Sequence, residues 1–359
     1  MAKKIIFTGG GTAGHVTLNL ALIPIFLEKG WDVVYIGSYN GLEKELVSRF
    51  EKVKYIPILT GKMRRYFSWQ NFIDMVKIPF GIMQATFVVF KQKPDIVFSK
   101  GGFVSFPVVC AAKLNGIKCV MHESDVTPGL ANKMSLPFVS RFFTTFEDTI
   151  KHVKDKAKVE YVGPVLSDRL KNGVKLNACT LCDFDENKPT IMVIGGSLGA
   201  KSLNEAIRNN LSELLKKYQI IHICGKGQVE NGADTKGYKQ FDYVNDELKD
   251  FMAAADVVIS RAGSNAIFEL LSLNKPMILV PLSGASSRGE QMLNAKNFQQ
   301  NGYCEVVADD KLQEENLLLT TLEKVYNNRS VYVKNMIDSG FKVTNNHDLV
   351  DRIIEIQGD

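Results

Sequence analysis

The sequence has few cysteines, no long apolar run and no strong excess of charge of one sign. Its six cysteines are scattered and several lie in apolar stretches, which is typical of free thiols in a reducing cytosol. One CxxC pair, Cys179 and Cys182, has no second pair and no histidine partner, so a loop is favoured over a zinc site. No apolar run reaches the ~20 residues that span a bilayer, and the amino terminus enters a strand at once, so neither a membrane span nor a signal peptide is expected.

What is present is the composition of an ordinary cytosolic globular protein. Of the 359 residues, 45% are hydrophobic and 23% are charged, and the length suffices for two domains with separate cores. The 44 lysines and arginines against 39 aspartates and glutamates leave a formal net charge of +5, which mildly favours an anionic partner. Nucleic acid is not expected as a partner. A protein of this kind can still lie on a membrane surface.

The amino terminus carries a strand, a glycine loop and a helix. Residues Lys4–Thr8 form a β-rich run, GGGTAGH follows at residues 9–15, and apolar residues then recur at helical spacing. The pattern GxGxxG is typical of dinucleotide binding, which also needs an acidic residue at the end of the next strand to hold the adenosine ribose. The next strand, Asp32–Ile36, ends in glycine and serine, so the NAD hypothesis loses most of its support.

His15 stands where this glycine loop becomes a helix. In a parallel α/β sheet that position lies at the carboxyl edge, where ligands bind. A neutral imidazole there can take a proton from a hydroxyl group, which makes His15 a candidate general base. The alternative, which the residue alone supports equally well, is a histidine that only hydrogen-bonds its own loop.

Residues 62–83 combine aromatic, aliphatic and basic side chains. Aromatic residues interleaved with bases suit a bilayer interface that carries anionic headgroups. A helix hairpin packed on the sheet is the alternative, and much of the apolar content belongs to a core. Because the bases cluster beside the aromatic residues, we expect part of the stretch to be exposed. The residues expected at the membrane are Arg64, Arg65, Phe67, Trp69 and Phe72.

Two further strand ends carry residues suited to a site. A strand that ends before residue 100 runs into Gly101 and Gly102, a second glycine turn that feeds a helix and could frame one cleft with the first. Another strand ends in His122 and Glu123, and Asp125 follows on the next loop. Polar groups at the carboxyl end of a strand are more often functional than structural in this architecture, although His122 can also be a buried, satisfied histidine.

The second half of the chain repeats the first. A domain boundary is expected near Pro164, after a charged stretch. The sequence GGSLGAKSLN at residues 195–204 follows a strand and echoes GGGTAGHVTLN at residues 9–19, which predicts a second α/β domain with a mostly parallel sheet. Asp183 and Asp185 form a DxD pattern, which metal-dependent sugar transferases use for a divalent ion. Because the pattern precedes a strand instead of following one, a solvated turn is expected there.

The stretch ISRAGSNAIFELL at residues 259–271 contains a strand end, a small-residue turn and the start of a helix. The first amide groups of that helix, at Ser264, Asn265 and Ala266, lack internal partners and attract oxyanions such as phosphate. Glu269 follows about one turn later, and a carboxylate there can accept hydrogen bonds from both hydroxyls of a ribose. A serine N-cap with an ordinary solvated glutamate is the alternative, which these residues alone favour.

Several motifs follow one another along the chain in an order that chance does not explain. They are GGGTAGH at 9–15, SKGGFVSFP at 99–107, HESDVTPGLANK at 122–133, GGSLGAKSLN at 195–204, and SRAGSNAIFEL with the later RGEQMLNA. Over essentially the whole chain they resemble the MurG family, glycosyltransferases that add N-acetylglucosamine to the lipid-linked muramoyl-pentapeptide of peptidoglycan.

The resemblance implies an α/β fold with two Rossmann-like domains whose parallel sheets face across a cleft, the GT-B architecture. It implies an acceptor- and membrane-facing domain at residues 1–163 and a UDP-sugar-binding domain at 164–340. The remaining residues, 341–359, are expected to form a C-terminal helix that can pack back on the N-terminal domain.

The resemblance also assigns roles to residues. On the donor side, it implies that Ser197, Gly263, Ser264 and Asn265 hold the diphosphate, Glu269 the ribose, Val244 the uracil, and Glu290 and Gln291 the sugar hydroxyls. On the acceptor side, it implies that Thr12, Ala13, Gly14 and His15 meet the sugar and the acceptor, with Asp125 nearby and the turn at Gly101 and Gly102 beside them.

Two positions depart from the family pattern. Where the family commonly has an arginine after an interdomain Asn-Pro-Val, this chain has Leu166, so a phosphate or base contact is either absent or supplied by Arg169. Where many members have an asparagine, this chain has Asp125, which changes the group that would contact the sugar.

The expected reaction is a single in-line displacement. The muramoyl 4-hydroxyl attacks the anomeric carbon of UDP-N-acetylglucosamine, and the α-linked donor becomes a β-1,4 product. His15 takes the proton, with Glu123 or Asp125 assisting. No metal or cofactor is expected, so helix-end amides and Ser197 would stabilise the charge that grows on UDP. An anionic membrane surface is the expected partner, with the protein peripheral on its cytoplasmic face.

Two other functions fit the same features. A glycosyltransferase of this architecture that acts on another lipid, such as diacylglycerol, would keep the Glu269 site and differ where the acceptor binds. A non-catalytic nucleotide-binding or membrane-binding protein would keep the phosphate loops and release no UDP.

Overall fold

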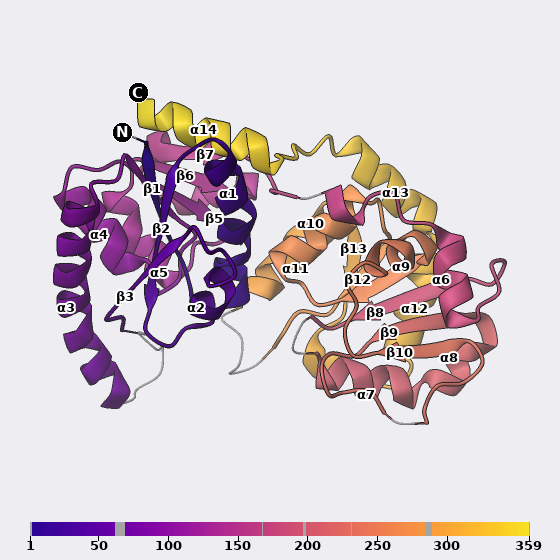
Figure 1. The fold of residues 1–359 in the computed structure, drawn as a ribbon. Coiled ribbons are helices and arrows are strands. Elements are labelled where there is room, and N and C mark those ends of the chain that lie inside the picture. The colour runs from indigo at the N-terminus through magenta and orange to yellow at the C-terminus, as the bar shows by residue number, and fades with distance from the viewer. Residues whose placement is uncertain are drawn as a thin grey trace. The chain divides into compact units, whose positions relative to one another are not determined.

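The chain folds into two compact units, seen in the computed structural model of Figure 1. The structure describes residues 2–61, 69–166, 168–196, 199–230, 232–283 and 289–358, without the side chains of residues 69–76 and 168. The first unit runs to Val165 and resumes at Lys342, and the second comprises Leu166–Phe341. The sequence analysis drew the two boundaries after residues 163 and 340, close to these positions.

The first unit contains a seven-stranded parallel sheet in the order β3-β2-β1-β4-β5-β6-β7. Its strands are β1 (Lys4–Thr8), β2 (Asp32–Ser38), β3 (Lys54–Ile58), β4 (Ile96–Ser99), β5 (Cys119–Glu123), β6 (Arg141–Thr144) and β7 (Val159–Tyr161). Its α-helices are α1 (Thr17–Glu28), α2 (Leu42–Val47), α3 (Trp69–Gln92), α4 (Phe106–Leu114), α5 (Leu130–Ser135) and α14 (Asn346–Gly358).

Alternation along β1 builds two cores, one on each face of this sheet. Ile5 and Phe7 pack in a cluster with α1 and α14, whereas Ile6 between them packs in a second cluster with α3 and α4. Successive side chains of a strand point to opposite faces, so a parallel strand covered on both sides must be apolar throughout. This explains why the strands are continuous apolar runs.

The C-terminal helix α14 belongs to the first unit. Four of its residues lie in the core cluster that also contains side chains of α1: Leu349, Val350, Ile353 and Ile356. The Arg352 guanidinium donates two hydrogen bonds to the Glu160 carboxylate, at 2.8 and 2.9 Å. The chain that leads into α14 is also paired, because the Thr344 N–H donates to the Pro164 carbonyl at 3.0 Å.

The second unit contains a six-stranded parallel sheet in the order β10-β9-β8-β11-β12-β13. Its strands are β8 (Thr190–Ile194), β9 (Gln219–Ile223), β10 (Tyr238–Phe241), β11 (Val257–Ser260), β12 (Met277–Leu279) and β13 (Cys304–Val306). Its α-helices are α6 (Lys175–Cys182), α7 (Lys201–Asn209), α8 (Leu211–Lys217), α9 (Leu248–Ala254), α10 (Ser264–Ser272), α11 (Glu290–Gln300), α12 (Leu317–Asn327) and α13 (Arg329–Asp338). Two α/β units with parallel sheets confirm the predicted fold class.

Each sheet has one point at which the strand order reverses, and the predicted loops lie there. In the first unit the chain builds β1, β2 and β3 to one side and then starts β4 on the other side of β1. In the second unit β8 and β11 stand in the same relation. The carboxyl ends of strands at such a switch point leave a crevice in which α/β proteins bind ligands. Both glycine loops of the first unit therefore start at its crevice.

The region around Cys179 and Cys182 differs from the prediction. Both residues lie in α6 and not in a loop, and both are buried as free thiols. The prediction was wrong because apolar contacts outweigh the polar composition of this short segment. The DxD pattern that follows is a turn, as predicted: Asp183 adopts a left-handed conformation with φ of 57° and exposed Asp185 accepts a hydrogen bond from the Asn187 N–H at 2.9 Å.

Candidate functional site

The first glycine loop is held from below by buried polar groups. The Asn19 amide of α1 donates to the Thr8 carbonyl and to the Tyr35 hydroxyl, both at 3.1 Å, and this hydroxyl donates to the Gly9 carbonyl at 2.7 Å. The loop backbone is thus fixed from inside the fold. Its outer surface is free for a ligand, since Thr12, Ala13 and Gly14 are exposed and His15 is half-buried.

A buried glutamate, Glu43 of α2, lies beneath the loop. It stands next to the end of β2, where dinucleotide-binding proteins have the acidic residue that holds the ribose. It is fully buried and accepts hydrogen bonds from the Gly11 N–H at 3.4 Å and the Ser38 N–H at 3.0 Å. A Cβ added at Gly10 would lie 2.5 Å from the Glu43 carboxyl carbon, so the loop must have glycine there. Because these oxygens bind the protein's own backbone, Glu43 is a support for the loop and not a ribose ligand.

The second glycine turn lies directly against His15. Gly101 and Gly102 both have positive φ, 88° and 84°, which favours glycine. A Cβ on Gly102 would lie 2.3 Å from the Gly10 carbonyl oxygen and 3.0 Å from His15 Cδ2. The two turns therefore interlock, and the imidazole of His15 rests on the backbone of the second turn. The two turns thus lie together at this edge of the sheet, and the ligand site that they were expected to frame stays a prediction.

Glu123 does not have the surroundings of a proton-transfer group. It is 3% exposed, and one oxygen accepts from the Ser124 and Asp125 N–H groups at 2.9 and 3.1 Å. The other oxygen accepts from the Gly129 N–H at 3.1 Å and the Asn132 amide at 2.8 Å. Four donors use the lone pairs of the carboxylate, so the suggestion that Glu123 assists His15 is corrected: it holds the loop that carries half-buried Asp125.

His122 is a buried core histidine. It is 2% exposed, and burial followed by the charge of Lys100 holds its pKa well below the usual value, so the ring is neutral. Its Nε2 lies 3.5 Å from the Thr145 hydroxyl. His122 is therefore buried, as the alternative held, but its Nδ1 has no hydrogen-bond partner among the described residues, so the histidine is not fully satisfied.

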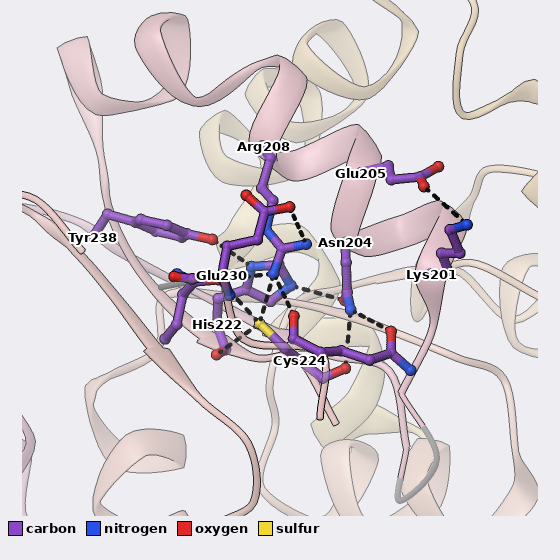
Figure 2. A network of polar contacts seen from close by, with 10 residues as sticks. Lys201, Asn204, Glu205, Arg208, His222, Cys224, Glu230 and Tyr238 are labelled. Carbon is purple, nitrogen blue, oxygen red and sulfur yellow. Dashed lines mark hydrogen bonds and ion pairs between the residues drawn. The ribbon is translucent and has the colours of Figure 1, made fainter. Parts of the chain in front are cut away.

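In the second unit a polar network, shown in Figure 2, holds the loop after β9, against which Gly199 of the glycine loop packs: a Cβ on Gly199 would lie 2.4 Å from the Cys224 carbonyl oxygen. Asn204 of α7, which stands in the repeated motif as Asn19 does, donates to the Cys224 carbonyl at 3.0 Å and to the Gln228 side chain at 2.9 Å. His222 bridges Asn204 at 3.0 Å and the Tyr238 hydroxyl at 2.9 Å, and burial lowers its pKa to about 3. The side chain is therefore neutral and structural.

Arg208, on the next turn of α7, holds the loop after β9. Its guanidinium donates to the Gln228 carbonyl at 2.6 Å and to the Gln240 side chain at 2.8 Å, and it pairs with Glu230 at 3.0 Å. The Gly227 N–H of this loop donates to Asp242 at 3.0 Å, two residues before the predicted uracil contact at Val244. Val244 is itself buried, at 9% exposure. The network thus connects α7 and the loop after β9 with the segment expected to meet the base.

The strand end β11 is tied to α7 by a buried arginine. Arg261 is 8% exposed and donates to the Asp309 carboxylate at 2.6 Å, to the Ser202 hydroxyl at 3.0 Å and to the Val280 carbonyl at 3.2 Å. The Ser202 hydroxyl donates to the same Asp309 oxygen at 2.6 Å. These bonds fix the first turn of α7 relative to the ends of β11 and β12.

The helix expected to bind phosphate begins where it was predicted. Helix α10 starts at Ser264, with Gly263 as its N-cap and no side chain capping the first amides. The serine N-cap alternative is therefore wrong. Asn265 is exposed at this helix start, and Ser264 is 7% exposed. The first-turn N–H groups consequently have no side-chain acceptor at the cap, which suits an anion.

Glu269 is partly buried in α10 and pairs with the arginine singled out in the sequence. Arg169 Nη2 lies 3.5 Å from Glu269 Oε1, and the exposed fractions of the two side chains are 66% and 26%. Burial raises the pKa of Glu269, and the Arg169 charge opposes this shift. Glu269 is therefore not the ordinary solvated glutamate of the alternative interpretation.

The remaining predicted donor residues are only partly described. Ser197 lies outside the described residues. Glu290 and Gln291 form the start of α11, and the Gln291 side chain accepts from the Leu282 N–H at 3.2 Å. Among the described residues no group of three histidine, cysteine, aspartate or glutamate side chains is placed to hold a metal ion.

The predicted membrane residues lie mostly beyond what the structure describes. Arg64, Arg65 and Phe67 are outside the described residues, and Trp69 and Phe72 lie in α3 without a described side chain. Further along α3 an exposed apolar face follows helical spacing, which we call the α3 face: Phe80, Met83, Phe87 and Phe90, with Leu114 of α4. None of the described helices has the combined length and apolarity required to cross a bilayer.

The residues that support the loops were not predicted from the sequence. Tyr35, Glu43 and Arg208 lie in none of the motifs, and Asn19 and Lys100, which do, were given no role. One signal was available, because Asn19 and Asn204 end the two echoed motifs.

Comparison with known proteins agrees with this geometry. The glycosyltransferase family 28 N-terminal domain matches residues 5–144, and the glycosyltransferase family 28 C-terminal domain matches residues 190–353. The structure of Acinetobacter baumannii MurG is similar with a TM-score of 0.77 and 22% identity, over 98% of this chain and 99% of that one. At this identity the likeness establishes the fold, which is that of a glycosyltransferase.

Curated relatives are much closer in sequence. A protein of Geobacillus thermodenitrificans is 52% identical over 341 residues, 95% of each chain. One of Clostridium botulinum is 51% identical over 346 residues, 95% of this chain and 97% of the relative. Both are named UDP-N-acetylglucosamine--N-acetylmuramyl-(pentapeptide) pyrophosphoryl-undecaprenol N-acetylglucosamine transferase. With this identity over nearly its whole length, the chain belongs to the MurG family of glycosyltransferases.

Proposed function

We propose that the chain transfers N-acetylglucosamine from UDP-N-acetylglucosamine to the 4-hydroxyl of a lipid-linked muramoyl-pentapeptide, with inversion at the anomeric carbon. The observation that carries the proposal is 52% identity over 95% of the chain to a relative named for this transfer. The supported glycine loops and the uncapped start of α10 fit the same chemistry.

On the acceptor side, the proposal makes His15 the general base. Its half-buried ring rests on Gly102 at the switch point of the first sheet, where the backbone fixes its direction. A base fixed in this way can accept the proton of the attacking hydroxyl as the glycosidic bond forms, which is worth about 10²- to 10⁴-fold in rate. Exposed Thr12, Ala13 and Gly14 line the approach to it.

On the donor side, the proposal assigns the diphosphate to the first turn of α10 and to the glycine loop before α7. As the bond to the sugar breaks, negative charge grows on UDP, and preorganised N–H groups stabilise it without reorganising. Arg261 and Ser202 keep the two helix starts in place. Glu269 accepts the ribose hydroxyls, Val244 lies against the base, and Glu290 and Gln291 meet the sugar.

The proposal places the protein peripherally on the cytoplasmic face of a membrane, where a lipid-linked acceptor is found. The α3 face supports this, since four large apolar side chains at helical spacing are each more than half exposed: Phe80 54%, Met83 66%, Phe87 66% and Phe90 67%. Lys91, Lys93 and Lys113 are exposed on the same two helices or at their ends. Apolar residues flanked by lysines suit a bilayer with anionic headgroups.

A UDP-release assay with two acceptors tests the proposed function. The protein is supplied with UDP-N-acetylglucosamine in detergent, with either a lipid-linked muramoyl-pentapeptide or diacylglycerol. UDP release with the first acceptor alone is expected. Release with diacylglycerol instead would indicate a transferase for another lipid, and release with neither acceptor would leave only nucleotide binding; both results contradict the proposal.

A further inference from the structure

A buried lysine lies at the centre of the acceptor-side site and has no role in the reaction as described so far. Lys100 follows the last residue of β4, is 3% exposed, and its N–H donates to the Thr8 carbonyl at 2.9 Å. A Cβ added on Gly9 would lie 3.2 Å from the Cβ of Lys100. Lys100 therefore lies between the first glycine loop and the turn on which His15 rests.

Burying an ammonium group is costly unless charges and hydrogen bonds compensate for it. Burial lowers the pKa of Lys100, and the nearby carboxylates Glu123 and Asp125 oppose this shift. Its Nζ donates a short hydrogen bond to the Ser124 hydroxyl. The charge of Lys100 is thus stabilised by Glu123, the last residue of β5, and by Asp125 of the loop that follows.

That loop is held at several points, and Lys100 contributes a positive charge beside it. Glu123 accepts from the backbone at both ends of the loop, and the Thr149 hydroxyl donates to the Asp125 carbonyl at 3.3 Å. The other titratable group facing Lys100 is His122, which stays neutral beside the cation.

We propose that Lys100 is a positioning residue for the transfer reaction. Its ammonium group fixes the loop that carries Asp125 against the sheet edge that carries His15. Its positive charge balances the negative charges of Glu123 and Asp125. The proposal rests on the proposed function. It assigns Lys100 no direct contact with the substrates, because the side chain is buried beneath the loops.

The test compares Lys100→Met with Ser124→Ala and with Lys52→Met as a matched control. Methionine keeps the length of the buried side chain and removes the charge, a change that often preserves or increases stability. Ser124→Ala removes the hydrogen-bond acceptor and keeps the cation. Lys52 is an exposed lysine of the first unit, in the turn before β3. For each protein, kcat and KM for both substrates are measured between pH 5.5 and 9, ~0.5 pH unit apart, and the melting temperature is recorded.

For Lys100→Met we expect kcat to fall by about 10- to 100-fold, the range that a small misplacement at a reacting centre costs. The KM for UDP-N-acetylglucosamine stays within about twofold, because the donor loops are in the other unit. The acidic limb of the pH–rate profile moves to higher pH, since loss of a cation favours protonation of neighbouring carboxylates. Ser124→Ala lowers kcat less and leaves the limb in place, and Lys52→Met matches the parent.

A parental kcat and pH profile in Lys100→Met would overturn the proposal. So would a loss of activity that follows the folded fraction while the profile and both KM values stay parental, because Lys100 would then only stabilise the fold. These outcomes are distinct from failure of the proposed function, in which the unsubstituted protein itself transfers no N-acetylglucosamine.

Discussion

The ribose contact proposed for Glu269 gives the sharpest quantitative prediction. Replacing this residue by alanine removes a carboxylate that would accept two hydrogen bonds from the ribose of UDP. A hydrogen bond to a charged group contributes about 1.5–3 kcal/mol. In the free protein, binding must first displace Arg169, which lies 3.5 Å away and is 66% exposed. An exposed pair of this kind is worth at most about 1 kcal/mol.

The net loss for Glu269→Ala is therefore about 2–5 kcal/mol, or roughly 30- to 5,000-fold in the dissociation constant of UDP. Removing one ribose hydroxyl from the ligand should remove one of the two bonds. For the parent protein, 2′-deoxy-UDP should bind about 10- to 150-fold more weakly than UDP. For Glu269→Ala, the two ligands should bind about equally.

Isothermal titration calorimetry of both nucleotides with both proteins closes this thermodynamic cycle. Glu213→Gln is the matched control, because Glu213 is an exposed glutamate of the same unit whose carboxylate pairs with Lys216 at 2.7 Å. It should bind both nucleotides as the parent does. If Glu269→Ala still discriminates against 2′-deoxy-UDP as strongly as the parent, the ribose assignment is wrong.

The same residue predicts a pH dependence. Burial raises the pKa of Glu269 above its ordinary value, and the ionised form is the one that accepts both hydroxyls. UDP affinity should therefore fall as the pH drops through this raised pKa, and Glu269→Gln should show no such dependence. A carboxyl with a raised folded-state pKa stabilises the fold below that pKa and not above it. Glu269→Gln should consequently keep its melting temperature at pH 7, and a drop of several degrees would contradict this argument.

The remaining predictions concern the other sites. His15→Ala should lower kcat by about 10²- to 10⁴-fold with little change in UDP affinity, and near-parental turnover would exclude His15 as the base. Gly102→Ala should lower the free energy of unfolding by about 1–3 kcal/mol and lower turnover, because a φ of 84° is strained for alanine and the new Cβ meets Gly10 and His15. Gly129→Ala is the control, and it should be tolerated because a Cβ there has no neighbour within 4 Å. Urea unfolding and turnover assays compare the two variants. Phe87→Ser should weaken sedimentation of the protein with anionic vesicles. Ile337→Ser, at a residue that is 61% exposed in the second unit, should not. Equal vesicle binding by both variants would show that the α3 face does not bind the membrane.

The course of the chain was predictable wherever a local pattern implies a local structure. Gly9 to His15 and Ile259 to Glu269 each combine an apolar run, small residues and an amphipathic segment, and the structure places a strand, a turn and a helix there. The pattern failed where composition misrepresents packing. Cys179 and Cys182 stand in a polar segment, yet their side chains are buried in a short helix.

Site roles were harder to predict, and Glu123 illustrates the reason. Its position at a strand end suggested proton transfer, but four donors from residues 124–132 surround its carboxylate. Whether a carboxylate is a catalytic group or a support depends on which N–H groups come within about 3 Å, and these belong to a loop whose course is not encoded in the spacing of the motif.

By itself, the sequence determined the two α/β units and the glycine turns at the strand ends, because strand, turn and helix signals act over a few residues. It also determined the family, because the family's motifs can be read directly from short stretches of sequence. Only the tertiary structure decided which groups hold the loops of the sites: Asn19 beneath the first glycine loop, Asn204 and Arg208 at the loop after β9, and buried Lys100 at Ser124. The physical reason is that burial and hydrogen-bond saturation depend on residues far apart in the chain. They become defined only when parallel strands bring their carboxyl ends to one edge.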